Sequence, residues 1–238
     1  FRAGQRSTVN LNAPLGMVFP GDQGIPEGLV PTDYNNVAPR VGIAFDPRGD
    51  GRTSVRLSYG LFFEDLRSDV FTYAAVNQPF VISNTVNTPR SLVNPYAGTV
   101  DPFPYIYTTA TSRFTFPMSL FTSPAPTLNA SYIHNLSASI QQALPGGMQL
   151  NVGYVGKLEK GLVRMIQANP ATYGPGATLA NTDARRPLLP GVYASVRQVC
   201  NCSPATYHSM QVSLSKRYSG GLTFMLAYTF GKLLDQYS

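Results

Sequence analysis

Few side chains in this sequence combine a reactive group with a spacing that supports chemistry. The two histidines, His134 and His208, each fall within a run of alternating apolar and polar residues. A histidine-based nucleophilic site needs a nucleophile beside the ring and an acid that orients it. The sequence holds no G-x-S-x-G elbow and no G-x-x-x-x-G-K-[ST] loop. We therefore expect no enzyme, and we place both histidines on strands, near a strand end.

Candidate metal ligands are equally sparse. Cys200 and Cys202 form a Cys-Asn-Cys triplet with too few histidine or cysteine neighbours for a closed zinc site. We interpret them as a loop pair without a catalytic role, and a local disulfide stays open as an alternative. Glu64, Asp65 and Asp69 read as the solvated base of a loop. The sequence thus predicts no catalytic, cofactor-binding or metal-binding residue.

The sequence predicts three hairpins, and these must position any functional residues of the chain. Alternation with a period of two residues marks strands with one apolar face. In the third hairpin Phe224, Leu226 and Tyr228 share a face opposite Thr223 and Ala227. The predicted hairpins span about residues 36–63, 131–157 and 206–234, and each has a short turn rich in glycine or polar residues.

Long connections separate these hairpins. Residues 64–130 and 158–205 are rich in Pro, Asn, Thr and Gly. Within the first we expect short strands or a helical turn near residues 65–75, and weak strand character over 76–89. Residues 1–35 read as an irregular loop. Its Gly-Asp-Gln-Gly segment, residues 21–24, predicts a turn, because the regular ligand spacing of a calcium loop is missing.

The composition indicates where the apolar faces lie. Charged residues make up 13% of the chain, against about 25% in a typical soluble domain. The polar strand faces carry Ser, Gly, Asn, Gln and Thr in place of Lys and Glu. Short turns at one end and long loops at the other are typical of outer-membrane barrels. The sequence therefore predicts an all-β, antiparallel up-and-down meander, a partial segment of a transmembrane β-barrel with long loops.

Charge and hydropathy exclude several other classes. The formal net charge is +6, but no dense basic patch or recognition helix predicts nucleic-acid binding. Anionic lipid headgroups are a better partner for basic residues near strand ends. No apolar run is long enough for a membrane-spanning helix. No signal peptide opens the sequence, and we expect an internal piece of a longer protein.

Four segments resemble one family of receptors. Residues 33–64, 137–157 and 207–235 look like hairpins from the barrel of Oar-like TonB-dependent receptors, as found in acidobacteria and related Gram-negative bacteria. Residues 13–33 resemble the loop that precedes the first hairpin. The resemblance implies that residues 1–238 are a fragment of a receptor barrel in the outer membrane. Its expected partners are membrane lipid, the rest of the barrel and plug, and the TonB complex through parts not present here.

The resemblance implies energised uptake of a ligand across the outer membrane. Loop residues would determine which ligand binds. They form no recognisable ligand-binding motif, so the ligand-binding residues stay unknown. Arg48-Gly49-Asp50 spells an adhesion tripeptide, although its surroundings suit a polar turn. A structural or adhesive surface protein without transport is therefore the alternative. Loop aromatics such as Tyr107 and Phe121 either stack on a ligand or pack the loop on itself, and we favour packing.

Overall fold

A computed structural model describes residues 1–66, 68–82 and 86–236 of the chain. The chain divides into two compact units. The loop unit contains Phe1–Pro31, Arg67–Leu128 and Met165–Val199, and the sheet unit contains Thr32–Leu66, Asn129–Arg164 and Cys200–Ser238. Within the described part of the chain, no helix is both long enough and apolar enough to cross a membrane.

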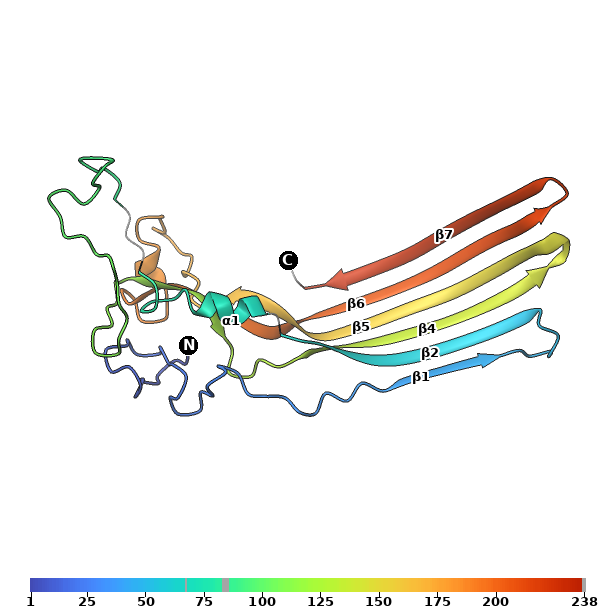
Figure 1. The fold of residues 1–238 in the computed structure, drawn as a ribbon, viewed down its shortest axis with the longest axis horizontal. Coiled ribbons are helices and arrows are strands. Elements are labelled where there is room, and N and C mark those ends of the chain that lie inside the picture. Colours follow the sequence, from blue (N-terminus) through green and yellow to red (C-terminus); the bar gives the residue numbers. More distant parts are fainter. Residues whose placement is uncertain (67, 83–85, 237–238) are drawn as a thin grey trace. The chain divides into compact units, whose positions relative to one another are not determined.

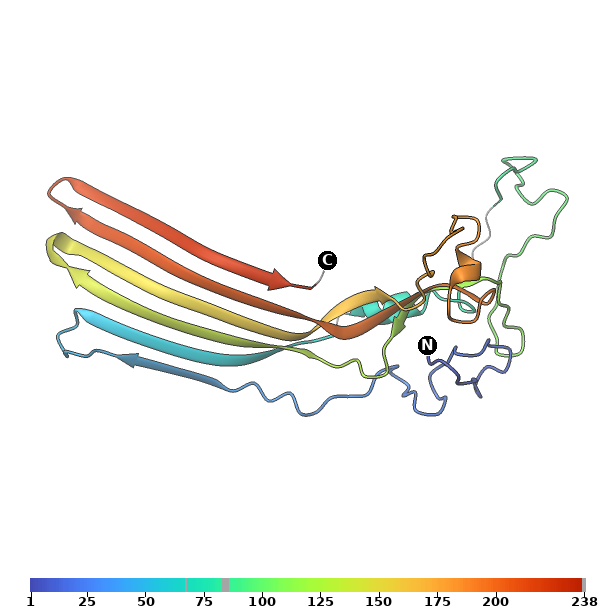
Figure 2. The ribbon, with the colours of Figure 1, turned by 180° about the vertical axis from the view of Figure 1, so that it is seen from behind.

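Six strands form the sheet: β1 (Arg40–Phe45), β2 (Thr53–Glu64), β4 (Ser131–Leu144), β5 (Met148–Gln167), β6 (Tyr193–Ser219) and β7 (Leu222–Asp235). The end of β5 after Arg164 and the start of β6 before Cys200 belong to the loop unit. The six strands are hydrogen-bonded in that order. Successive strands run antiparallel and lie in a single layer (Figures 1 and 2). The predicted all-β antiparallel meander is therefore confirmed.

The strand register aligns the apolar residues into continuous rows. Ile43 of β1 lies opposite Leu57 of β2, which lies opposite Ala138 of β4, which in turn pairs with Tyr154 of β5. On the other side of the unit, Val212 of β6 pairs with Tyr228 of β7. Side chains two residues apart share a face. The cross-strand rows that contain these residues are therefore apolar and share one face of the sheet. The rows between them lie on the opposite face and carry the polar residues.

Three short turns join the strands, and all lie at the same end of the sheet (Figure 1). In the first, the Asp46 carboxylate accepts hydrogen bonds from the backbone N–H of Gly51 (2.7 Å) and Arg48 (3.1 Å). The Gly51 bond is the main cause that lowers the pKa of Asp46. The second turn contains the 3₁₀ turn η1 (Pro145–Gly147). In the third, Gly220 and Gly221 have φ of 60° and 77°, which glycine adopts without steric cost.

The loop unit is built around a small mixed core. Strand β3 (Met118–Pro124) pairs in parallel with residues 193–199 at the start of β6. Helix α1 (Ser68–Ala74) lies in the connection before it, and the 3₁₀ turn η2 (Asp183–Arg185) lies in the second connection. The buried hydrophobic cluster of the loop unit consists of Ala13, Met17, Phe19, Met118, Leu120, Tyr193 and Val196. The N-terminal loop and β3 therefore share one core, although about a hundred residues separate them in the sequence.

The strands extend further than the sequence pattern predicts. β5 runs past Lys157 to Gln167, and β6 begins at Tyr193, so the second connection spans residues 168–192 and not 158–205. The charged residues Glu159 and Lys160 in β5 and Pro204 in β6 hide the alternation there. β3 lies in the stretch predicted to hold short strands, and α1 lies where a helical turn was expected. Residues 76–82 and 86–89 contain no strand, and 83–85 lie outside the described residues.

Candidate functional site

The apolar face of the sheet unit is open to its surroundings. Val41, Ile43 and Phe45 of β1 are 60–61% exposed, and Leu226, Tyr228 and Phe230 of β7 are 61–64% exposed. The buried hydrophobic cluster of the described residues lies in the loop unit and includes none of them. A continuous exposed apolar surface of this kind marks a contact with lipid or protein. The twelve residues of β2 rise about 28 Å at a ~45° tilt, which matches an outer-membrane apolar band.

The opposite face of the sheet is polar but mostly uncharged. The hydroxyls of Ser58 and Ser137 lie 2.7 Å apart across β2 and β4. The Thr53 hydroxyl donates to the side-chain oxygen of Gln142 at 2.8 Å. In these two pairs, uncharged hydroxyl and amide groups satisfy one another. A barrel of this type has such a polar interior behind its lipid-facing side.

Two tyrosine–histidine pairs repeat on the apolar face. The hydroxyl of Tyr59 lies 2.8 Å from Nδ1 of His134, and the hydroxyl of Tyr154 lies 2.6 Å from Nδ1 of His208. Gly156 leaves room for the Tyr154 ring, because a Cβ there would lie 2.7 Å from the hydroxyl. Both histidines therefore lie on strands, as predicted, but only His134 is near a strand end, because His208 lies in the middle of β6. Their tyrosine partners come from neighbouring strands, so no short sequence motif predicts these tyrosine–histidine pairs.

The aromatic residues at the ends of β2 and β4 away from the short turns divide between the two faces. Phe63 and Tyr132 pack with ring centroids 6.2 Å apart on the apolar face. Phe62 instead points to the polar face, where the Arg40 guanidinium lies 4.5 Å from its ring centroid. Phe62 therefore does not belong to an aromatic girdle on the lipid-facing side, because adjacent residues of a strand point to opposite faces. The arginine attracted to the ring explains why an aromatic side chain is stable there.

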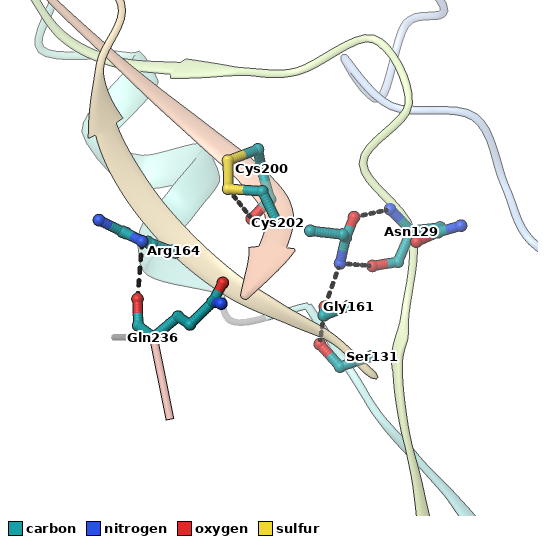
Figure 3. The surroundings of a disulfide bond; sticks show 8 residues. Asn129, Ser131, Gly161, Arg164, Cys200, Cys202 and Gln236 are labelled. Atoms are coloured by element: carbon teal, nitrogen blue, oxygen red, sulfur yellow. Dashed lines mark hydrogen bonds between the residues drawn. A yellow bond between two sulfur atoms is a disulfide. The ribbon is translucent and has the colours of Figure 1, made fainter. Parts of the chain in front are cut away.

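The two cysteines lie within β6 and not in a loop, which corrects the sequence interpretation. Cys200 and Cys202 form a disulfide (Figure 3). The Asn201 side chain between them links β6 to β5 and to the segment just before β4. The Asn201 side chain exchanges two 2.8 Å hydrogen bonds with the backbone of Asn129 and donates to the Gly161 carbonyl at 2.7 Å. Gly161 has φ of 66°, so the β5 backbone leaves regular strand geometry there. The Asn201 amide donates a hydrogen bond to the backbone at this irregular position.

A carboxylate organises the N-terminal part of the loop unit. Although burial alone would raise the pKa of Asp22, hydrogen bonds from Phe19, Ser7, Thr8 and Val9 lower it to about 2. The backbone N–H of Thr8 donates at 2.6 Å, that of Phe19 at 2.8 Å and that of Val9 at 3.1 Å. Asp22 thus ties two segments of the loop together. The predicted turn at residues 21–24 is confirmed, but its anchoring role depends on partners that the motif does not contain.

Tyr193 closes the core of the loop unit. Its side chain is fully buried, and its hydroxyl donates to the Leu15 carbonyl at 3.0 Å. Burial raises the pKa of this phenol, so it stays protonated and remains a donor. Loop aromatics also pack together: the Phe80 and Tyr107 rings lie 5.0 Å apart, and Tyr73 and Phe121 lie 5.4 Å apart. These contacts agree with the favoured packing of the loop on itself.

A cavity of about 260 Å³ opens in the loop unit. Phe19, Phe71 and Phe80 supply much of its apolar wall. The wall is held by Asn77, whose side chain donates to the Thr122 carbonyl (2.7 Å) and accepts from the Phe121 N–H (2.6 Å) on β3. No loop residue was assigned to a ligand site from the sequence, because these segments meet only in three dimensions. Among the described residues there is no group of three or more His, Cys, Asp or Glu that could hold a metal.

Comparisons with known proteins agree with this architecture. The outer membrane transporter YddB from Escherichia coli has a similar structure, with a TM-score of 0.54 over 84% of this chain at 11% sequence identity. At that identity the likeness shows the fold alone, and the match covers 20% of the YddB chain. A search of curated proteins finds no match. The outer membrane beta barrel domain family matches residues 2–238. The chain therefore belongs to the outer membrane beta barrel domain family, and its sheet is a piece of a barrel wall in the outer membrane.

Proposed function

We propose that the chain is part of an Oar-like TonB-dependent receptor, which binds a ligand outside the cell and takes it up across the outer membrane. One observation carries this proposal: the chain contains both a sheet with an exposed apolar face and a folded loop unit with a cavity. The segments that resemble Oar-like receptors, residues 33–64, 137–157 and 207–235, fall on the three hairpins of the sheet unit. The proposed role is binding and transport, not catalysis.

The edges of the sheet explain why the function belongs to a larger barrel. Among the described strands, β1 pairs only with β2, and β7 pairs only with β6. Lipid cannot satisfy unpaired backbone groups, so a membrane-spanning sheet must close on itself. Outer-membrane transporters of this kind have about 22 strands. The proposed receptor therefore completes its barrel, holds its plug and contacts TonB through other parts of the protein.

The test uses the whole protein that carries these residues, purified in detergent from its own outer membrane. It is mixed with the soluble C-terminal domain of TonB from the same organism, and complex formation is measured by calorimetry. We expect a complex, and we expect ligand uptake by cells to stop when the proton gradient is dissipated. A heat-modifiable barrel that never binds TonB would contradict the proposal and favour a structural or adhesive surface protein.

A further inference from the structure

The apolar face of the sheet unit carries two lysines toward the strand ends that lie away from the short turns. Lys160 of β5 lies directly opposite Tyr132 of β4, and Lys232 of β7 lies directly opposite His208 of β6. Because side chains two residues apart share a face, Lys232 lies on the same face as Phe230, which is 64% exposed. Both lysine side chains are exposed. This face therefore combines an apolar surface with positive charge at one end.

The protein itself does not neutralise these two lysines. All acidic residues of the described strands alternate onto the polar face: Glu64, Glu159 and Asp235. Among the described residues, no ion pair joins either lysine to a carboxylate. Lys216, on the same face at the turn end of the sheet, differs because its ammonium donates to the carbonyls of Ser219 (2.6 Å) and Leu222 (3.3 Å). The two lysines at the other end thus keep an uncompensated charge.

Each of these lysines adjoins one of the tyrosine–histidine pairs. Lys232 is directly opposite His208, whose Nδ1 lies 2.6 Å from the Tyr154 hydroxyl. The same set of residue types recurs diagonally across β2, β4 and β5: Tyr59, His134 and Lys160. A tyrosine hydroxyl that donates to Nδ1 leaves the histidine proton on Nε2, where it can be donated to another group. Each tyrosine–histidine–lysine set therefore presents an ammonium and an imidazole N–H side by side on one face.

Both sets lie where lipid headgroups meet the sheet. Lys232 follows the exposed apolar residues Leu226, Tyr228 and Phe230 along the same face of β7. A lysine stem lies along such an apolar surface while its ammonium reaches the headgroup layer. Outer-membrane barrels keep their short turns in the periplasm, and both sets lie toward the opposite end of the sheet (Figure 1). The two sets therefore lie in the outer leaflet.

From this arrangement we infer that the two tyrosine–histidine–lysine sets bind the phosphate groups of anionic lipids in the outer leaflet. The phosphate accepts hydrogen bonds from the lysine ammonium and from the histidine Nε2–H, and the acyl chains lie along the apolar rows of the strands. Because no carboxylate shares this face, the site favours a lipid with a net negative headgroup over a zwitterionic lipid. The inference depends on the membrane position of the sheet and not on the receptor function proposed above.

The test uses the whole protein in detergent, with phosphatidic acid as the probe and phosphatidylcholine of the same acyl chains as its zwitterionic counterpart. Native mass spectrometry counts the lipid molecules retained during a titration. Phosphatidic acid should be retained at least about fivefold more tightly, as expected for a lysine at a headgroup. Lys160→Gln and Lys232→Gln should each remove one tightly held lipid, and the double variant should abolish the preference. His208→Phe keeps a ring but removes the donor, so it should weaken one site about threefold.

Lys157→Gln is the matched control, because Lys157 lies on the same strand as Lys160 but pairs with Asn135 on the polar face. It should leave the retention of both lipids unchanged. Equal retention of the two lipids, or equal losses in Lys157→Gln and Lys160→Gln, would overturn the inference. Displacement of phosphatidic acid by inorganic phosphate at the same concentration would show a site for free phosphate and would overturn the assignment to a lipid.

Discussion

Replacing Asp22 with asparagine tests whether one buried carboxylate holds the N-terminal part of the loop unit. One carboxylate oxygen accepts from Thr8 and Val9, and the other accepts from the Phe19 N–H. Asparagine keeps one acceptor but turns an N–H₂ group toward one of these donors. A buried donor without a partner costs about 1–3 kcal/mol. We therefore expect Asp22→Asn to destabilise this segment by about 2 kcal/mol.

The pH dependence gives an independent magnitude for the same carboxylate. Its pKa falls from 3.8 to about 2 on folding, which corresponds to about 2 kcal/mol. A depressed pKa stabilises the folded state above the unfolded pKa, and this stabilisation is lost as pH falls toward 2. It should decline from about 2 kcal/mol at pH 6 to about 1 kcal/mol at pH 3 and to less than about 1 kcal/mol at pH 2.

Hydrogen exchange measured by mass spectrometry on the whole protein in detergent follows this segment directly. At pH 6, Asp22→Asn should lower the protection of residues 7–9 and 19 by about thirtyfold, and the difference should shrink at pH 3. Asp33→Asn is the matched control, because Asp33 makes an exposed hydrogen bond to Asn35 within its own turn. A change below about threefold, or an equal change in the control, would refute the reasoning.

The remaining predictions concern the sheet unit. Tyr228 and Thr229 are adjacent near the middle of β7 and point to opposite faces. Tyr228→Arg places a charge on the lipid-facing side and should destabilise the barrel by about 2–4 kcal/mol, measured by urea unfolding in vesicles. Thr229→Arg faces the polar interior and should destabilise it by less than about 1 kcal/mol in the same assay. Cys200→Ser with Cys202→Ser should cost no more than about 2 kcal/mol in the same assay, because the disulfide closes a very short loop; a larger loss would contradict this limit. Asn201→Ala should cost about 2–4 kcal/mol through its hydrogen bonds to two backbone segments, and Asn201→Asp should rescue little of it, because a carboxylate cannot donate to the Gly161 carbonyl.

The alternation of apolar and polar residues predicted the strand segments that have one apolar face. β2 and β4 alternate cleanly, and their pairing follows from that pattern because a one-residue slip would expose the wrong face. The outer parts of β5 and β6 escaped prediction, because Glu159, Lys160 and Pro204 interrupt the alternation. There the strands belong partly to another unit, and a single apolar face no longer governs the sequence.

The candidate site could not be predicted from the sequence for a different reason. Its cavity joins the N-terminal loop, helix α1 and strand β3, which lie far apart along the chain. Which side chains line the cavity depends on how these segments meet in the folded unit. The turn at Asp22 was visible as a glycine-rich segment, but its donors Thr8 and Phe19 belong to no common motif.

The central claim is that one face of this sheet lies against lipid and the other lines a polar interior. Spin labels placed one at a time along residues 224–230 of β7, in the whole protein in lipid vesicles and in a background without cysteines, measure it directly. Accessibility to dissolved oxygen should peak at residues 224, 226, 228 and 230, and accessibility to a water-soluble nickel complex should peak at 225, 227 and 229. Equal accessibility to both reagents at all seven positions, or the opposite phase, would contradict the account.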